Sequence, residues 1–205
     1  MMTLHWSPRS PYVRKVMVAA HEIGLADRLN CVRTVVGGTT PHLELMRENP
    51  LGKIPTLVLE DGTILFDSPV VCEYLDTLHS GPKLYPASGP ERFTALRRNA
   101  LGSGMIDMGL LLLGERFRPE ERRSQAHIDL WTLKLRTSVA ALEQEANAMA
   151  AGPFTIGHVA IGVALSYLDF RFDALKWREG HPCLAAWYAI FDARPSSQAT
   201  RLAEG

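Results

Sequence analysis

Leu51-Gly52-Lys53-Ile54-Pro55-Thr56-Leu57 and, a short way along the chain, Asp67-Ser68-Pro69 are the residues that say most about how this protein folds. The first run predicts a loop that ends where a strand begins at Pro55, and the second predicts a helix capped by Ser68. Between them, Asp61-Gly62 with apolar residues on both sides predicts the tight turn of a β-hairpin. A strand that begins at proline, a hairpin and a serine-capped helix together form a backbone platform of the kind that binds small peptides.

The residues before this platform predict a strand, a helix and a second strand in succession. Apolar residues at helical spacing follow Ser10-Pro11, so we expect a helix from about Pro11 to Gly24 with Ser10 as its N-cap. Because the three elements follow one another within so short a length, the two strands are expected to be parallel. The elements predicted for this compact α/β domain with a mixed sheet are strands over 2–6, 28–34, 55–59 and 63–66, and helices over 11–24, 42–48 and from 68 onward.

After residue 80 the pattern changes from strands to helices. The segment 81–90 is rich in Gly, Pro and Ser and is the clearest linker in the chain. The sequence therefore predicts an α/β domain over residues 1–80, a linker over 81–90 and an all-α helical bundle over 91–205. The helices expected in the bundle run over 91–117, 120–151, from about 155 onward and after 182.

The composition of the chain indicates which partners and which cellular compartment to expect. Acidic and basic residues number 22 each, so the formal net charge is zero and nucleic acid is not expected as a partner. No run approaches the roughly 18 apolar residues that a membrane helix needs, and no signal peptide is visible, so no membrane partner is expected. The three cysteines, Cys31, Cys72 and Cys183, are far apart without metal-binding spacing. We therefore expect reduced thiols, no metal site and a cytoplasmic protein.

Three groups of residues, taken in order, resemble a known family. They are Ser7-Pro8-Arg9-Ser10-Pro11-Tyr12-Val13-Arg14-Lys15, then Asn49-Pro50-Leu51-Gly52-Lys53-Ile54-Pro55, then Asp67-Ser68, with the helical bundle behind them. The arrangement resembles the cytosolic glutathione S-transferases, and in particular their bacterial serine-type members and the uncharacterised GST-like proteins related to them. This resemblance implies a thioredoxin-like first domain, an all-α second domain, glutathione as co-substrate, and a homodimer with a role in detoxification.

The resemblance implies a catalytic hydroxyl at Ser7. A glutathione transferase uses its co-substrate as a thiolate, whereas a free thiol has a pKa of ~8.5. A helix N-terminus and a hydroxyl donor both stabilise a thiolate. Ser7 lies just before the predicted helix, and aligning Val13-Arg14 with the serine-type pattern places the family's hydroxyl there. Ser10 is the runner-up because it is better used as the helix cap, and without the resemblance Ser7 is a plain turn residue.

The same resemblance assigns glutathione-binding roles to the platform. It implies a cis Ile54–Pro55 bond, which would turn the Ile54 backbone outward to pair with the cysteinyl part of glutathione. Lys53 would meet the glycine carboxylate; His42 is a second candidate, although a solvated surface side chain accounts for His42 better. The Ser68 hydroxyl and N–H would bind the γ-glutamyl carboxylate at a helix N-terminus, with Asp67 near its ammonium.

Apolar residues of the first long helix are candidates for the second substrate's pocket. Met105, Met108 and Leu112 are expected to line an electrophile pocket between the domains, because methionine suits adaptable surfaces. The alternative is that this face belongs to the core or to a dimer interface.

Thr155-Ile156-Gly157-His158 departs from the Ser/Thr-x-x-Asp capping pattern that relatives commonly carry at this point. Thr155 keeps the cap, but a protonated His158 would oppose the helix dipole at a cost of about 0.3–1 kcal/mol. We therefore expect His158 to weaken this helix start, and its replacement by Asp to raise the melting temperature.

The predicted function is that of a glutathione transferase, in which the activated thiolate attacks a small hydrophobic electrophile. One alternative is a non-catalytic glutathione-binding module that acts as a ligand carrier or protein partner. Another is a different glutathione-dependent enzyme, such as an isomerase, a dehalogenase or a peroxidase. A retained serine and a retained glutathione platform are compatible with all of these.

Overall fold

A computed structural model describes residues 1–204, which form two compact units. The first unit contains residues 1–92 together with 195–204, and the second contains residues 93–194. The segment 195–204 thus packs with the first unit, although the sequence places it in the helical domain, whose expected last residue, Gly205, lies outside the described residues.

The first unit is built on a four-stranded sheet with the strand order β2-β1-β3-β4. β1 and β2 are parallel, with Trp6 beside Arg33, whereas β3 is antiparallel to both of its neighbours. The mixed sheet that the sequence predicts is therefore confirmed. Its strands are β1 (Met2–Trp6), β2 (Leu29–Arg33), β3 (Thr56–Val58) and β4 (Ile64–Leu65).

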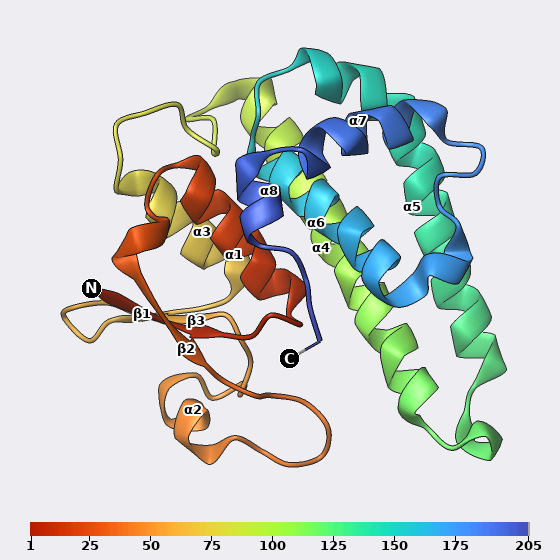
Figure 1. Ribbon diagram of the computed structural model, residues 1–205, viewed down its shortest axis with the longest axis horizontal. Coiled ribbons are helices and arrows are strands. Elements are labelled where there is room, and N and C mark those ends of the chain that lie inside the picture. Colours follow the sequence, from red (N-terminus) through yellow and green to blue (C-terminus); the bar gives the residue numbers. More distant parts are fainter. Residues whose placement is uncertain (205) are drawn as a thin grey trace. The chain divides into compact units, whose positions relative to one another are not determined.

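Two helices, α1 (Pro11–Glu22) and α3 (Ser68–Thr77), pack against each other, and α3 also contacts β3 (Figure 1). Their apolar stripes meet the sheet in a core that excludes water, because each helix carries apolar residues at helical spacing. The shorter helices of this unit are η1 (Ala26–Arg28), α2 (Leu43–Glu48) and α8 (Pro195–Ala199). The fully buried residues of this core include Leu4, Val13, Val16, Leu57, Val71 and Leu75.

Every regular element within residues 93–194 is a helix, which confirms the all-α prediction for this part of the chain. α6 is apolar on all sides and is almost wholly buried. α4 approaches α6 so closely that a Cβ at Gly102 would lie 2.5 Å from the carbonyl carbon of Ala160. None of the helices within residues 1–204 is both long and apolar enough to cross a membrane. The elements are α4 (Gly89–Phe117), η2 (Glu120–Arg122), α5 (Gln125–Ala151), α6 (Ile156–Phe172), η3 (Asp173–Leu175) and α7 (Pro182–Asp192).

The C-terminal segment is the part of the fold that the sequence does not predict. α8 lies against α1 (Figure 1). The buried Arg14 of α1 donates from Nη2 to the carbonyl oxygen and the hydroxyl oxygen of Ser197, at 3.2 and 3.0 Å. Further on, the Ala203 N–H donates to the Pro8 carbonyl at 3.2 Å. The segment therefore ties down the loop that leads into α1.

Candidate functional site

The loop between β1 and α1 carries the two candidate serines. Ser10 is the N-cap of α1, and its Oγ accepts a hydrogen bond from the Val13 N–H at 3.2 Å. This confirms its predicted capping role. Ser7 is half-buried, and its Oγ lies 3.4 Å from the Arg9 N–H, which can only donate to it. The Ser7 hydroxyl thus keeps its own proton to donate, and its catalytic role stays a prediction.

The loop before β3 is fixed by a buried amide. The Ile54–Pro55 bond is cis, as the resemblance implies. The Asn49 Nδ2 donates to the Lys53 carbonyl at 3.0 Å and to the Thr56 Oγ1 at 2.9 Å, and the Thr56 hydroxyl donates to the same carbonyl at 2.8 Å. Asn49 is 1% exposed and was not singled out from the sequence. The sequence feature that could have pointed to Asn49 is the Asn-Pro pair at the start of the loop.

The Ile54 side chain and backbone have different surroundings. The side chain is buried in a cluster with Val13 and Leu45. Within residues 1–204, neither the N–H nor the C=O of Ile54 makes a hydrogen bond to another protein group. Lys53, just before it, is exposed. The loop therefore presents an unpaired backbone amide and carbonyl beside a surface cation.

The expectation that Ser68 is a helix cap is wrong. α3 begins at Ser68, and Asp67 occupies the N-cap position, because the first helical bond runs from the Val71 N–H to the Asp67 carbonyl at 3.0 Å. The Ser68 side chain is fully buried, and its Oγ has no hydrogen-bond partner within residues 1–204. Leaving a buried polar group unpaired costs about 1–3 kcal/mol.

This unpaired hydroxyl lies in the first turn of a ten-residue helix. The first N–H groups of a helix and its dipole favour an anion at that end. Asp67 beside it is exposed and makes no capping bond. The peptide bond between Phe66 and Asp67 is also cis, which was not predicted from the sequence. The start of α3 can therefore accept a carboxylate at Ser68, with a second carboxylate nearby for an ammonium group.

His42 has a structural role in the first unit. It is the N-cap of α2, and its Nδ1 accepts a hydrogen bond from the Leu45 N–H at 3.1 Å. This engagement leaves only Nε2 for any other partner. The geometry therefore favours the structural interpretation of His42 over the ligand-binding one.

A cavity of about 270 Å³ lies beside both serines in the first unit. Its walls come from the end of β1, from the loop before α1, from α1 itself, from β2 and from residues 199–201 of the C-terminal segment. The side chains of Arg14, Arg33 and Arg201 line it, and none of its lining residues is acidic. The sequence did not predict this cavity, because one of its walls is made by residues about 190 positions further along the chain.

Burial affects two of the three cysteines. Burial raises the pKa of the Cys72 thiol to about 12. Burial also raises the pKa of Cys31, which lines the cavity beside Ser7. Neither thiol is therefore an activated nucleophile near neutral pH. Within residues 1–204, no group of three or more His, Cys, Asp or Glu side chains is arranged to hold a metal ion.

The three residues expected to line an electrophile pocket lie on α4. Met105 and Leu112 are 2% and 6% exposed, whereas Met108 is half-buried. Met105 and Leu112 share a helix face with Gly109, where an added Cβ would lie 2.9 Å from the Tyr167 ring of α6. That face packs within the helical unit, which favours the core interpretation for two of the three residues. Their role toward a second substrate stays a prediction.

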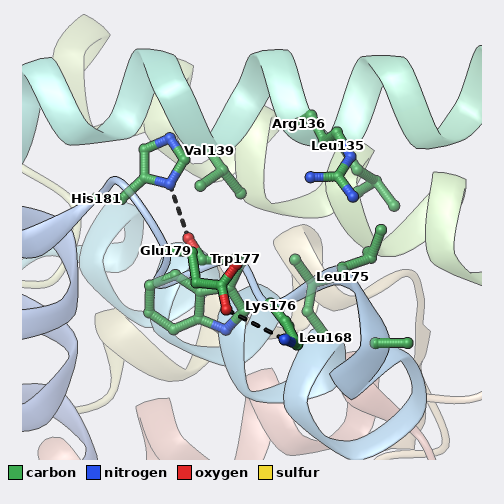
Figure 2. A pocket seen from close by; sticks show the side chains of 10 residues that line it. Leu135, Arg136, Val139, Leu168, Leu175, Lys176, Trp177, Glu179 and His181 are labelled. Atoms are coloured by element: carbon green, nitrogen blue, oxygen red, sulfur yellow. Dashed lines mark hydrogen bonds and ion pairs between the residues drawn. The ribbon is translucent and has the colours of Figure 1, made fainter.

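A second cavity, of about 210 Å³, lies within the helical unit between α5 and the segment that follows α6. Figure 2 shows that its polar side chains are largely engaged with protein groups. Lys176 Nζ and Glu179 Oε1 form an ion pair at 3.3 Å, and His181 Nδ1 lies 2.8 Å from the Trp177 carbonyl. None of the residues predicted to form a functional site lines this cavity.

The expectation that a protonated His158 weakens α6 is wrong. His158 is 4% exposed, and burial lowers its pKa, so the ring is neutral near pH 7. Its Nδ1 accepts a hydrogen bond from the Thr155 N–H at 3.1 Å, while Nε2 donates to the Met149 carbonyl at 3.1 Å. The neutral ring therefore performs the capping function of an acidic side chain and adds a bond to the end of α5.

Comparisons with known proteins agree with this architecture. Residues 9–78 match the family model described as "Glutathione S-transferase, N-terminal domain", and residues 125–189 match "Glutathione S-transferase, C-terminal domain". A relative from Escherichia coli, "Uncharacterized GST-like protein YibF", is 30% identical over 89% of this chain and 90% of its own.

Two solved structures of a glutathione transferase family member from Pseudomonas fluorescens Pf-5 are each 41% identical to the chain. One contains bound glutathione and superposes with a TM-score of 0.96 over 100% of both chains. The other contains bound S-(propanoic acid)-glutathione and superposes with a TM-score of 0.91 over 98% of this chain and 100% of its own. The chain belongs to the glutathione S-transferase family.

Proposed function

We propose that this protein binds glutathione and transfers its thiolate to a small electrophile. The observation that carries the proposal is the buried Ser68 hydroxyl, which lies in the first turn of α3 without a partner within residues 1–204. A γ-glutamyl carboxylate at this position would supply the missing acceptor and would be stabilised by the helix N-terminus.

The remaining platform residues suit the rest of the tripeptide. The unpaired N–H and C=O of Ile54 would bind the cysteinyl backbone in the manner of an added strand. The exposed Asp67 carboxylate would meet the γ-glutamyl ammonium, and the exposed Lys53 would meet the glycine carboxylate. Asn49 fixes the loop that carries Ile54, so the Ile54 backbone is held in place for the ligand.

Ser7 has the role of a hydrogen-bond donor and not of a nucleophile. Its hydroxyl proton is free to point at a sulfur, since the Arg9 N–H occupies only the acceptor side of Oγ. This bond and the N-terminus of α1 would favour the thiolate over the thiol. When the thiolate attacks a halocarbon, its electron pair forms the C–S bond while the halide leaves with the pair of the broken bond.

The relatives support this assignment. The Pseudomonas relatives hold glutathione and a carboxylate-bearing glutathione conjugate. A cytoplasmic homodimer that detoxifies electrophiles accords with the family, and we include it in the proposal.

Two measurements test the proposal. Calorimetric titration with glutathione should give saturable binding, and turnover should appear with at least one of an aryl halide, an epoxide and an activated alkene. The Ser7→Ala protein should still bind glutathione but lose turnover. Binding without turnover across the three electrophile classes would instead support a glutathione-binding module, and absence of binding would overturn the proposal.

A further inference from the structure

The cavity beside Ser7 contains cationic side chains from two distant parts of the chain. Arg33 ends β2 and lies directly beside Trp6, the residue before Ser7, in the parallel register of the sheet. Its guanidinium makes no hydrogen bond or ion pair within residues 1–204. Arg201 lines the same cavity from the C-terminal segment.

The C-terminal wall of this cavity is held in place by several bonds. Arg201 Nε lies 3.2 Å from Gln198 Oε1, and the Thr200 hydroxyl donates to the Ser196 carbonyl at 2.8 Å. The bond from the Ala203 N–H to the Pro8 carbonyl closes the segment onto the residue that follows Ser7. Arg201 is therefore carried by a segment tied to the serine loop, not by a free chain end.

We propose that the electrophile carries a carboxylate, which Arg33 and Arg201 bind while its reactive carbon faces the sulfur at Ser7. This inference rests on the proposed function and names its substrate class. Guanidinium groups form short, charge-assisted hydrogen bonds with carboxylates, and no acidic side chain lines the cavity to compete for them. The apolar side chains of Trp6 and Met17, which also line the cavity, suit the hydrocarbon part of a short organic acid.

Charge repulsion gives this arrangement a catalytic consequence. A thiolate and a carboxylate on approaching molecules repel each other, so an anionic electrophile reacts slowly with free glutathione. Two guanidinium groups beside the reaction centre offset that repulsion and raise the local concentration of the anion. The protein should therefore accelerate the reaction of an organic acid more than that of its neutral amide.

A pair of matched electrophiles provides the first half of the test. Chloroacetate and chloroacetamide both lose chloride as the C–S bond forms, and they differ mainly in the charge of the neighbouring group. The rate enhancement over free glutathione should be about tenfold greater for chloroacetate than for chloroacetamide. Arg33→Gln and Arg201→Gln should each reduce this ratio, whereas Arg28→Gln, at an exposed position outside the cavity, should preserve it.

The second half of the test does not depend on turnover. Calorimetry should give about tenfold tighter binding of S-(carboxymethyl)glutathione than of S-(carbamoylmethyl)glutathione, and the Arg33→Gln/Arg201→Gln double variant should bind both equally. Glutathione itself should bind the double variant as it binds the wild type. Equal binding of the two conjugates by the wild type, or a preference that survives in the double variant, would overturn the inference while leaving glutathione binding intact. Failure to bind glutathione at all would overturn the proposed function, and this inference with it.

Discussion

The Ser10 hydroxyl oxygen accepts a hydrogen bond from the Val13 N–H at 3.2 Å, three residues into α1. This bond satisfies one of the N–H groups that a helix start otherwise leaves unpaired. Ser10→Ala should therefore lower the free energy of unfolding by about 1 kcal/mol, measured by urea denaturation. Glutathione turnover per folded molecule should remain near that of the wild type.

Ser7→Ala should have the opposite effects, with stability kept and turnover lost. The hydroxyl caps no helix, so the free energy of unfolding should stay within about 0.5 kcal/mol of the wild type. Loss of a donor to a charged sulfur should lower the turnover rate by about 10- to 100-fold, with little change in glutathione affinity. Steady-state kinetics at saturating glutathione measures this directly. If Ser10→Ala abolishes turnover and Ser7→Ala does not, the roles of the two serines are reversed.

Ser68→Ala should weaken glutathione binding without lowering the stability of the ligand-free protein. Removing a buried hydroxyl that has no protein partner should leave the ligand-free melting temperature unchanged or slightly raised. Loss of its bond to a carboxylate should weaken glutathione binding by about tenfold or more. Thermal melts with and without glutathione report both effects on one sample. A destabilised ligand-free protein with unchanged affinity would contradict the assigned role.

Asn49→Ala should lower both the stability of the protein and its affinity for glutathione. The Asn49 amide supports the Lys53 carbonyl and Thr56, and its Oδ1 accepts from the Leu51 N–H at 3.0 Å. The loop would lose the bonds of this buried side chain, so the free energy of unfolding should fall by about 2–4 kcal/mol. The Ile54 backbone would also lose its fixed position, and glutathione affinity should fall. Wild-type affinity in a folded Asn49→Ala protein would argue against a positioning role.

His158 should make the protein less stable in mild acid. Burial lowers its pKa most strongly; the charges of Arg98 and Arg194 act in the same direction, and the bond to the Met149 carbonyl opposes them. The unfolded chain binds a proton near pH 6.5, where the folded protein still excludes it. The contribution of His158 to stability is therefore present above about pH 6.5 and is lost as the pH falls toward the lower folded pKa.

Denaturation curves from pH 8 to pH 5 check this prediction. The His158→Gln protein, which has no titrating ring at this position, should show a flatter decline over the same range. An identical pH dependence in the two proteins would mean that other groups dominate the acid response.

The sequence was sufficient for those features that depend on local patterns. The order of strands and helices followed from periodicity and from the Pro, Gly and Ser signals. The cap at Ser10 followed from the Ser-Pro pair, in which the proline is the first residue of α1. The same pair failed at Ser68, because α3 begins at Ser68 itself and Asp67 is the N-cap. The cis bond at Pro55 came from the family resemblance, since most X–Pro bonds are trans.

Features that depend on distant contacts could not be predicted. The bonds between Arg14 and Ser197 join residues 183 positions apart, and no local pattern marks either partner. The cavity lined by Arg33 and Arg201 likewise forms only because the C-terminal segment packs against the first unit. The neutral state of His158 likewise follows from its burial, which a sequence alone does not specify.

A crystal structure of the protein with glutathione is the decisive measurement for the proposed binding mode. We expect the γ-glutamyl carboxylate within hydrogen-bond distance of Ser68 Oγ, the cysteinyl backbone paired with Ile54, and the sulfur within hydrogen-bond distance of Ser7 Oγ. Glutathione bound away from Ser68, or with its sulfur at Ser10 instead of Ser7, would show that the proposed binding mode is wrong.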